Sequence, residues 1–252
     1  MKNFIIKVNS KKILNILGIA FILLIWFLLS TVFNNSLVVP KIIDVTKSFI
    51  NMLSVSRIYL LILKLLFNGF LTISISFLIG LIIAILSYKY QNFYEFISPI
   101  ISLLKTIPII AIIILLLIAV MSFAPYIAAS LVIIPIIFEG IYMTLKQLDK
   151  NITEDIKTVS ELNIAVITKF YIPLIFPNII TSLIQSFGLG IKVMVMAEYT
   201  SPRNNTFGAE IKRYYDNNDM EKVYALVIIL IIISAIVDMI LKKIREKQIK
   251  ET

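Results

Sequence analysis

Ionisable side chains lie inside several of the long apolar segments, where a charge needs either a partner or a function. Lys105, Glu139 and Lys192 each fall within a run of residues apolar and long enough to cross a bilayer. A charge at mid-bilayer costs about 2.5–3.5 kcal/mol on insertion scales. Lys105 and Glu139 lie at similar depth on successive antiparallel segments, so we predict that they pair. The alternative is that Lys105 extends to the cytoplasmic headgroups.

The apolar segment that contains Lys192 also carries two glycines, Gly188 and Gly190, which permit close helix packing or a bend. Its polar side chains either line a wet path or form hydrogen bonds between helices. Lys192 itself either faces such a path or is a structural charge paired with Glu198 or Glu139. The candidate path residues are Lys192, Gln185, Ser186 and Met196.

Composition places the chain among polytopic membrane proteins. It is 59% hydrophobic and 15% charged, which is more apolar surface than a soluble protein can bury. Cysteine and histidine are absent, which removes thiol nucleophiles, disulfides, Cys/His metal sites and imidazole catalysis, and we expect no cofactor. The net charge of +9 is typical of positive cytoplasmic loops, and we expect no nucleic-acid partner.

The hydropathy pattern predicts an all-α protein with about six transmembrane helices. The first apolar segment is too long for a cleaved signal peptide and is expected to remain as a span. With the N-terminus inside, the cytoplasmic segments hold fourteen basic residues against seven outside, which favours cytoplasmic termini. The expected spans are 13–33, 65–88, 98–121, 126–144, 174–197 and 223–241.

The chain is expected to form one membrane domain with small additions at its ends. Residues 1–60 hold the first span and an extracytoplasmic amphipathic segment, and residues 61–245 hold the remaining spans. Residues 246–252 form a basic cytoplasmic tail. The outside segment 37–53 is either a solvated loop or a helix that lies along the membrane surface. The outside segment 201–222 is either a solvated loop or an outer gate or docking surface.

The predicted cytoplasmic loop 145–172 is polar where its surroundings are apolar, with four basic and four acidic residues. Asn151 fits an N-cap with Glu154 three positions on, and the apolar spacing predicts two short helices. Pro173 then begins the next span at a position that a helix tolerates. Such a helix pair could insert apolar side chains into a groove on a partner protein. A loop lying on the headgroups is the alternative.

This loop resembles the EAA loop of permease subunits from bacterial ABC importers. Aligned on Pro173, the pattern places Glu154 on the motif's glutamate, while Asp155 and Ile156 replace its alanines and Ser160 its glycine. The proline and glutamate are matched and the small residues are not. The resemblance assigns contacts with the ATPase to Glu154, Asp155, Ile156, Ser160, Ile164, Ile167, Phe170 and Pro173.

Other segments resemble the permeases of nitrate, sulfonate and taurine importers. These are Val38-Val39-Pro40 before the amphipathic segment, Ser98-Pro99 with Leu104-Lys105-Thr106-Ile107-Pro108, Ala197-Glu198, Gly208 and Asp238. The resemblance implies a type I importer fold in a bacterial inner membrane. It also implies a homodimer of this chain, two ATPase subunits below it and an extracytoplasmic substrate-binding protein above it.

In that family the fifth span lines the translocation path, so Lys192 would favour an anionic solute. The chain lacks the glycine-rich phosphate loop of ATPases, and ATP hydrolysis is therefore expected in a partner. A secondary transporter or channel working alone is the alternative function, although it leaves the charged loop unexplained. An intramembrane enzyme has no catalytic set to work with, because no span contains a close carboxylate pair.

Overall fold

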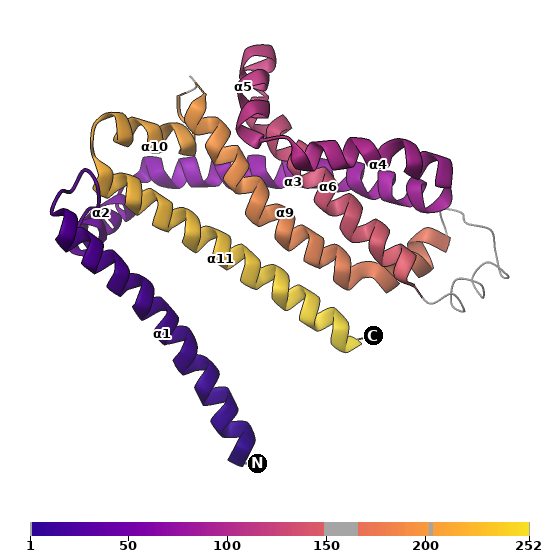
Figure 1. Ribbon diagram of the computed structural model, residues 1–252, viewed down its shortest axis with the longest axis horizontal. Helices are drawn as coiled ribbons and strands as arrows, with labels where there is room; N and C mark the ends of the chain where they lie inside the picture. The colour runs from indigo at the N-terminus through magenta and orange to yellow at the C-terminus, as the bar shows by residue number, and fades with distance from the viewer. Residues whose placement is uncertain (1, 149–165, 202–203, 252) are drawn as a thin grey trace. The chain divides into compact units, whose positions relative to one another are not determined.

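The structure is a computed structural model that describes residues 2–148, 166–201 and 204–251. Throughout these residues the regular elements are helices, which confirms the predicted all-α class (Figure 1). The chain divides into two compact units, one of residues 1–58 and 211–230 and the other of residues 59–210 and 231–252.

In the first unit, α1 (Lys2–Phe33) is joined to the turn before α2 (Ile42–Leu53) by its tryptophan. The Trp26 indole donates a hydrogen bond of 3.0 Å to the Pro40 carbonyl, and its ring lies 5.7 Å from that of Tyr224. The predicted amphipathic segment is helical as α2, and it buries Val45 and Met52 on one face. These contacts fix α2 against α1 and the start of α11 (Met220–Glu251).

The second unit is built around the packing of α6 (Ala124–Gln147) along α9 (Ile172–Thr200). Small residues allow the two backbones to approach closely. A Cβ on Gly140 of α6 would overlap the Ser182 hydroxyl of α9, and one on Gly190 of α9 would lie 2.6 Å from Ile133. The long helix α3 (Ser56–Lys89) packs on the same pair, since Gly69 contacts Ile191 and Gly80 contacts Ile137.

The predicted third span is not one continuous helix. It is divided into α4 (Gln91–Thr106) and α5 (Ile109–Val120), whose axes differ by 98°. Pro108 has no amide hydrogen to continue the helix, and it forces the preceding residue out of the helical region. Ile107 accordingly has the extended angles φ −68° and ψ 130°. The expected span 98–121 therefore contains a break at Pro108.

Among the described residues, five helices are long and apolar enough to cross a membrane, and the bent pair α4–α5 makes a sixth if counted as one span. The chain is therefore a multi-pass membrane protein. Several helices extend beyond the predicted spans: α3 begins at Ser56, before residue 65, and α11 continues to Glu251, beyond residue 241. The added turns carry basic residues, among them Arg57 and Lys64 in α3 and Lys242 and Lys243 in α11.

A tight corner joins α9 to α10 (Phe207–Asp216). The Gly208 amide donates a hydrogen bond of 3.0 Å to Glu198, whose side chain is buried. A Cβ on Gly208 would overlap the Val195 carbonyl oxygen, so only glycine permits this approach. Thr206 caps α10, because its hydroxyl accepts a hydrogen bond from the Ala209 amide.

Candidate functional site

Helix α9 has one packed side and one exposed stripe along its length. Exposed side chains recur at Asn178, Gln185, Leu189, Lys192 and Met196, which are spaced three, four or seven residues apart and so share one face. Ile191 and Met194, which lie between these positions, are buried, and Ile191 contacts Gly69 of α3. A stripe that is polar in part, on an otherwise apolar membrane helix, faces water or protein rather than lipid.

Three of the four predicted path residues share this stripe. Gln185, Lys192 and Met196 are exposed, whereas Ser186 is fully buried on the packed side with its hydroxyl unpaired. Helical spacing separates Gln185 from Ser186 by about 100°, so the two side chains lie on different faces of α9. Ser186 belongs to the interior of the second unit.

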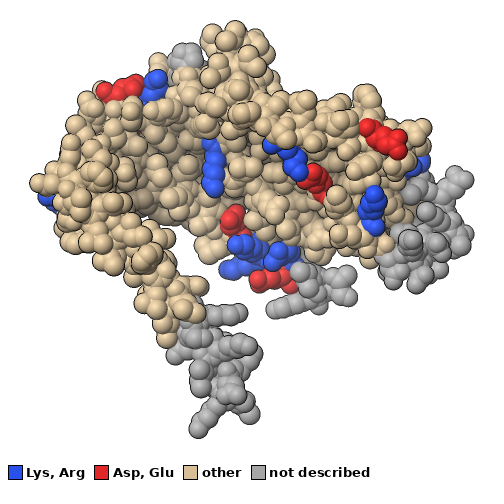
Figure 2. All heavy atoms as spheres, viewed as in Figure 1, with Lys and Arg blue, Asp and Glu red and all other residues tan. Residues whose placement is uncertain are grey.

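Lys192 is the cation of this stripe. Across the part of the chain that the structure describes, it forms no ion pair within 4 Å. Neither partner suggested by the sequence holds it, because Glu139 pairs with Lys105 and Glu198 accepts the Gly208 amide. Figure 2 shows that most of the face it draws consists of uncharged residues, with Lys, Arg, Asp and Glu gathered in a few places.

The predicted pairing of Lys105 with Glu139 is confirmed. The ammonium of Lys105 lies 2.7 Å and 2.8 Å from the two carboxylate oxygens of Glu139. Lys105 is in the last turn of α4, immediately before the bend at Pro108, and Glu139 is on α6. Their side chains are 50% and 41% exposed. The pair therefore connects the broken helix to the α6–α9 core.

An aromatic cluster beside the ion pair escaped the sequence analysis. The Tyr142 ring of α6 is stacked on Tyr94 of α4 at 4.6 Å and lies parallel to Phe138 at 5.5 Å. The Lys146 ammonium lies over the rings of both tyrosines, at 5.6 Å and 5.7 Å. Tyr94 and Tyr142 are far apart in sequence, so no local spacing indicates their contact. This cluster joins α4 to the last turns of α6, just before the polar loop.

Most of that loop lies outside the described residues, including Glu154, Asp155, Ile156, Ser160 and Ile164. Its C-terminal end is described: Ile167–Tyr171 form one turn of π-helix, η1, which runs directly into α9. Phe170 is half exposed and Pro173 is exposed in the first turn of α9. Tyr171 between them is buried, with its ring 5.8 Å from that of Tyr88. The packed Tyr171 thus fixes where the loop ends.

Comparison with known families identifies the fold and the class. Residues 76–250 match the family described as the binding-protein-dependent transport system inner membrane component. The chain belongs to this family. The match covers α4 to α11, and so includes the ion pair, the polar loop and the α9 stripe. No curated protein matches the chain in sequence.

Solved structures of the MetNI methionine ABC transporter in inward-facing conformations share the fold. The CY5 SeMet soak crystal form has a TM-score of 0.69 at 14% identity, and covers 76% of this chain and 96% of that one. The CY5 native form has a TM-score of 0.68 at 15% identity, covering 76% and 97%. The chain therefore shares the fold of these structures, and its family makes it an inner membrane component of a binding-protein-dependent transport system.

Proposed function

We propose that the chain is the permease subunit of a bacterial inner-membrane ABC importer that carries a small anion. Nitrate, sulfonates and taurine are the solutes of the importers that its sequence resembles. Two copies of the chain would form the path, two ATPase subunits would drive it, and an extracytoplasmic protein would deliver the solute. The observation that supports an anionic solute is Lys192, which is exposed on a membrane helix and forms no ion pair with any residue that the structure describes.

The exposed stripe of α9 supports this assignment of the path. Its polar members would hydrate a passing solute, and an uncompensated positive charge attracts anions most strongly where water is scarce. Lys192 can attract an anion without first leaving Glu139, because the Glu139 carboxylate already forms an ion pair with Lys105. The residues that we assign to the path are Gln185, Lys192 and Met196.

Coupling to the ATPase is assigned to the polar loop between α6 and α9. The described ends of the loop support this role, since both belong to helices of the tightly packed core. A force on the loop would therefore move α6 and α9 together. Within the loop we assign the main ATPase contact to Glu154, with Ile156, Ser160 and Ile164 filling a groove on the partner.

The experiment that tests the class is purification of the tagged chain from its native membrane, followed by assay for ATPase activity. We expect a stoichiometric ATPase to co-purify, and Glu154→Ala to reduce its recovery at least about tenfold. Glu95→Ala, which changes an acidic residue of α4, is the matched control and should retain the partner. A chain that transports its solute with no ATPase bound would support the stand-alone transporter instead.

A further inference from the structure

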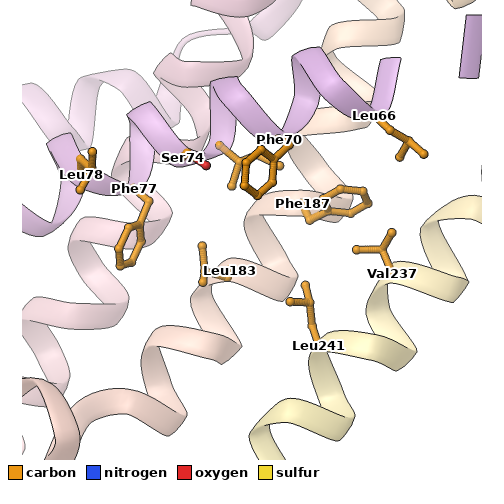
Figure 3. A pocket seen from close by; sticks show the side chains of 10 residues that line it. Leu66, Phe70, Ser74, Phe77, Leu78, Leu183, Phe187, Val237 and Leu241 are labelled. Carbon is orange, nitrogen blue, oxygen red and sulfur yellow. The ribbon is translucent and has the colours of Figure 1, made fainter. Parts of the chain in front are cut away.

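An apolar groove of about 550 Å³ runs along the second unit between three membrane helices. Figure 3 shows Phe70 and Phe187 side by side at its centre, with Leu183 and Leu241 farther along. Only one lining residue, Ser74, is polar. The groove is lined by Leu66, Phe70, Ile73, Ser74, Phe77 and Leu78 of α3, Leu183 and Phe187 of α9, and Val237 and Leu241 of α11.

A cluster of cations follows the groove along α11. Leu241 lines it, and the next two residues, Lys242 and Lys243, are exposed. Arg245 lies one turn beyond Leu241 and donates a hydrogen bond of 3.3 Å to Thr181 of α9, while its buried Nε has no acceptor among the residues that the structure describes. The predicted orientation places this end of α11 at the cytoplasmic surface. From this cytoplasmic end of α11 the groove then extends into the bilayer along α9 and α3.

We propose that the groove binds one acyl chain of an anionic phospholipid, with the lipid phosphate at Lys242, Lys243 and Arg245. Basic pockets between membrane helices on the cytoplasmic side are suited to anionic headgroups. The acidic residues of the same stretch are Asp238 and Glu246, which leaves the cations in excess. The unused donor of Arg245 would gain an acceptor when a phosphate oxygen binds.

The dimensions favour an acyl chain over a helix of a second copy. From Leu66 to Leu78 the groove follows α3 for about 18 Å at 1.5 Å per residue. Its volume of about 550 Å³ then gives a mean cross-section of roughly 30 Å². A helix with side chains is about 10 Å wide and needs roughly 80 Å². A single hydrocarbon chain is narrower than a helix, so it is the occupant that the groove favours.

Tryptophan quenching by lipids with brominated acyl chains tests the proposal. Trp26 is the only tryptophan, so a Trp26→Phe chain carrying Phe70→Trp reports on the groove. In vesicles that mix brominated and unlabelled lipid, we expect brominated phosphatidylglycerol to compete for this site about tenfold better than brominated phosphatidylcholine. Ile75→Trp in the same background is the matched control, because Ile75 is 57% exposed on α3 but does not line the groove.

The Ile75→Trp control measures the general enrichment of anionic lipid around a basic protein. It should show little preference for phosphatidylglycerol over phosphatidylcholine. Replacing Lys242 and Lys243 with Gln should lower the preference at Phe70→Trp from about tenfold to nearly that of the control. Equal quenching of Phe70→Trp by both lipids would overturn the proposal. A preference for phosphatidylglycerol that persists after Lys242 and Lys243 are replaced would also overturn the proposal. So would a tryptophan at position 70 that neither lipid quenches, because protein would then occupy the groove.

Discussion

The charged side chains of Lys105, Glu139 and Lys192 lie in two different environments in the membrane-spanning helices. Lys105 and Glu139 neutralise each other, whereas Lys192 remains unpaired among the described residues and exposed. The pairing could be predicted because opposite charges at equal depth on neighbouring spans have few other partners. The exposure of Lys192 could not, because it depends on which face of α9 packs against α6. Even the adjacent Gln185 and Ser186 differ in this respect.

The ion pair should behave as a coupled unit. Glu139→Gln or Lys105→Gln alone leaves one uncompensated charge, and each should lower the free energy of unfolding by about 1 kcal/mol or more. The double variant should be more stable than the sum of the two losses predicts. Thermal unfolding in detergent measures all three variants. Additive losses would mean that the two side chains contribute independently.

Gly208 should tolerate no side chain. Gly208→Ala places a Cβ against the Val195 carbonyl and the backbone of Tyr199, which cannot move without displacing the end of α9. We expect a loss of about 1–3 kcal/mol in the free energy of unfolding. Gly188→Ala is the matched control on α9, since no atom lies within 4 Å of its added Cβ, and its stability should be unchanged or slightly raised. Equal effects of the two changes would contradict the packing of this corner.

At the scale of helices, the sequence predicts where spans lie better than how they end. The apolar runs locate α1, α3, α6, α9 and α11, because bilayer thickness sets their minimum length. Pro108 marks a disturbance of the third span, but its local effect cannot give the 98° angle, which depends on what α4 and α5 pack against. The contact of α4 with α6 through Tyr94 and Tyr142 likewise arises from tertiary packing.

Tyr142 should be the main aromatic contact between α4 and α6. Its side chain is almost fully buried between Tyr94 and Phe138, so Tyr142→Ala should lower the free energy of unfolding by about 3 kcal/mol. Tyr142→Phe keeps both stacked rings and should cost less than about 1 kcal/mol. Phe96→Ala removes an exposed ring of α4 and should have little effect. Chemical unfolding followed by circular dichroism compares the three variants. Similar losses for Tyr142→Ala and Phe96→Ala would contradict this role of Tyr142 in the contact between α4 and α6.

At the scale of the whole molecule, the family explains features that no single helix does. The sequence contains no phosphate-binding loop, and we assign contact with an ATPase to the polar loop between α6 and α9. The resemblance of this loop to the EAA motif rests on Glu154 and Pro173, and the assignment stays a prediction. The solute could only be inferred as an anion, because in binding-protein-dependent systems the delivering protein selects it.

The most direct test of the account is ATP-dependent anion uptake by the complex reconstituted into vesicles, with nitrate, taurine and an alkyl sulfonate as solutes. Lys192→Met removes the charge at nearly constant length, and we predict that uptake of the transported anion falls at least about tenfold while ATPase activity remains. Lys192→Arg should retain most of the uptake. Lys47→Met, which removes an exposed lysine of α2, should leave it unchanged. Full anion uptake by Lys192→Met would contradict the assignment of this α9 face to the path.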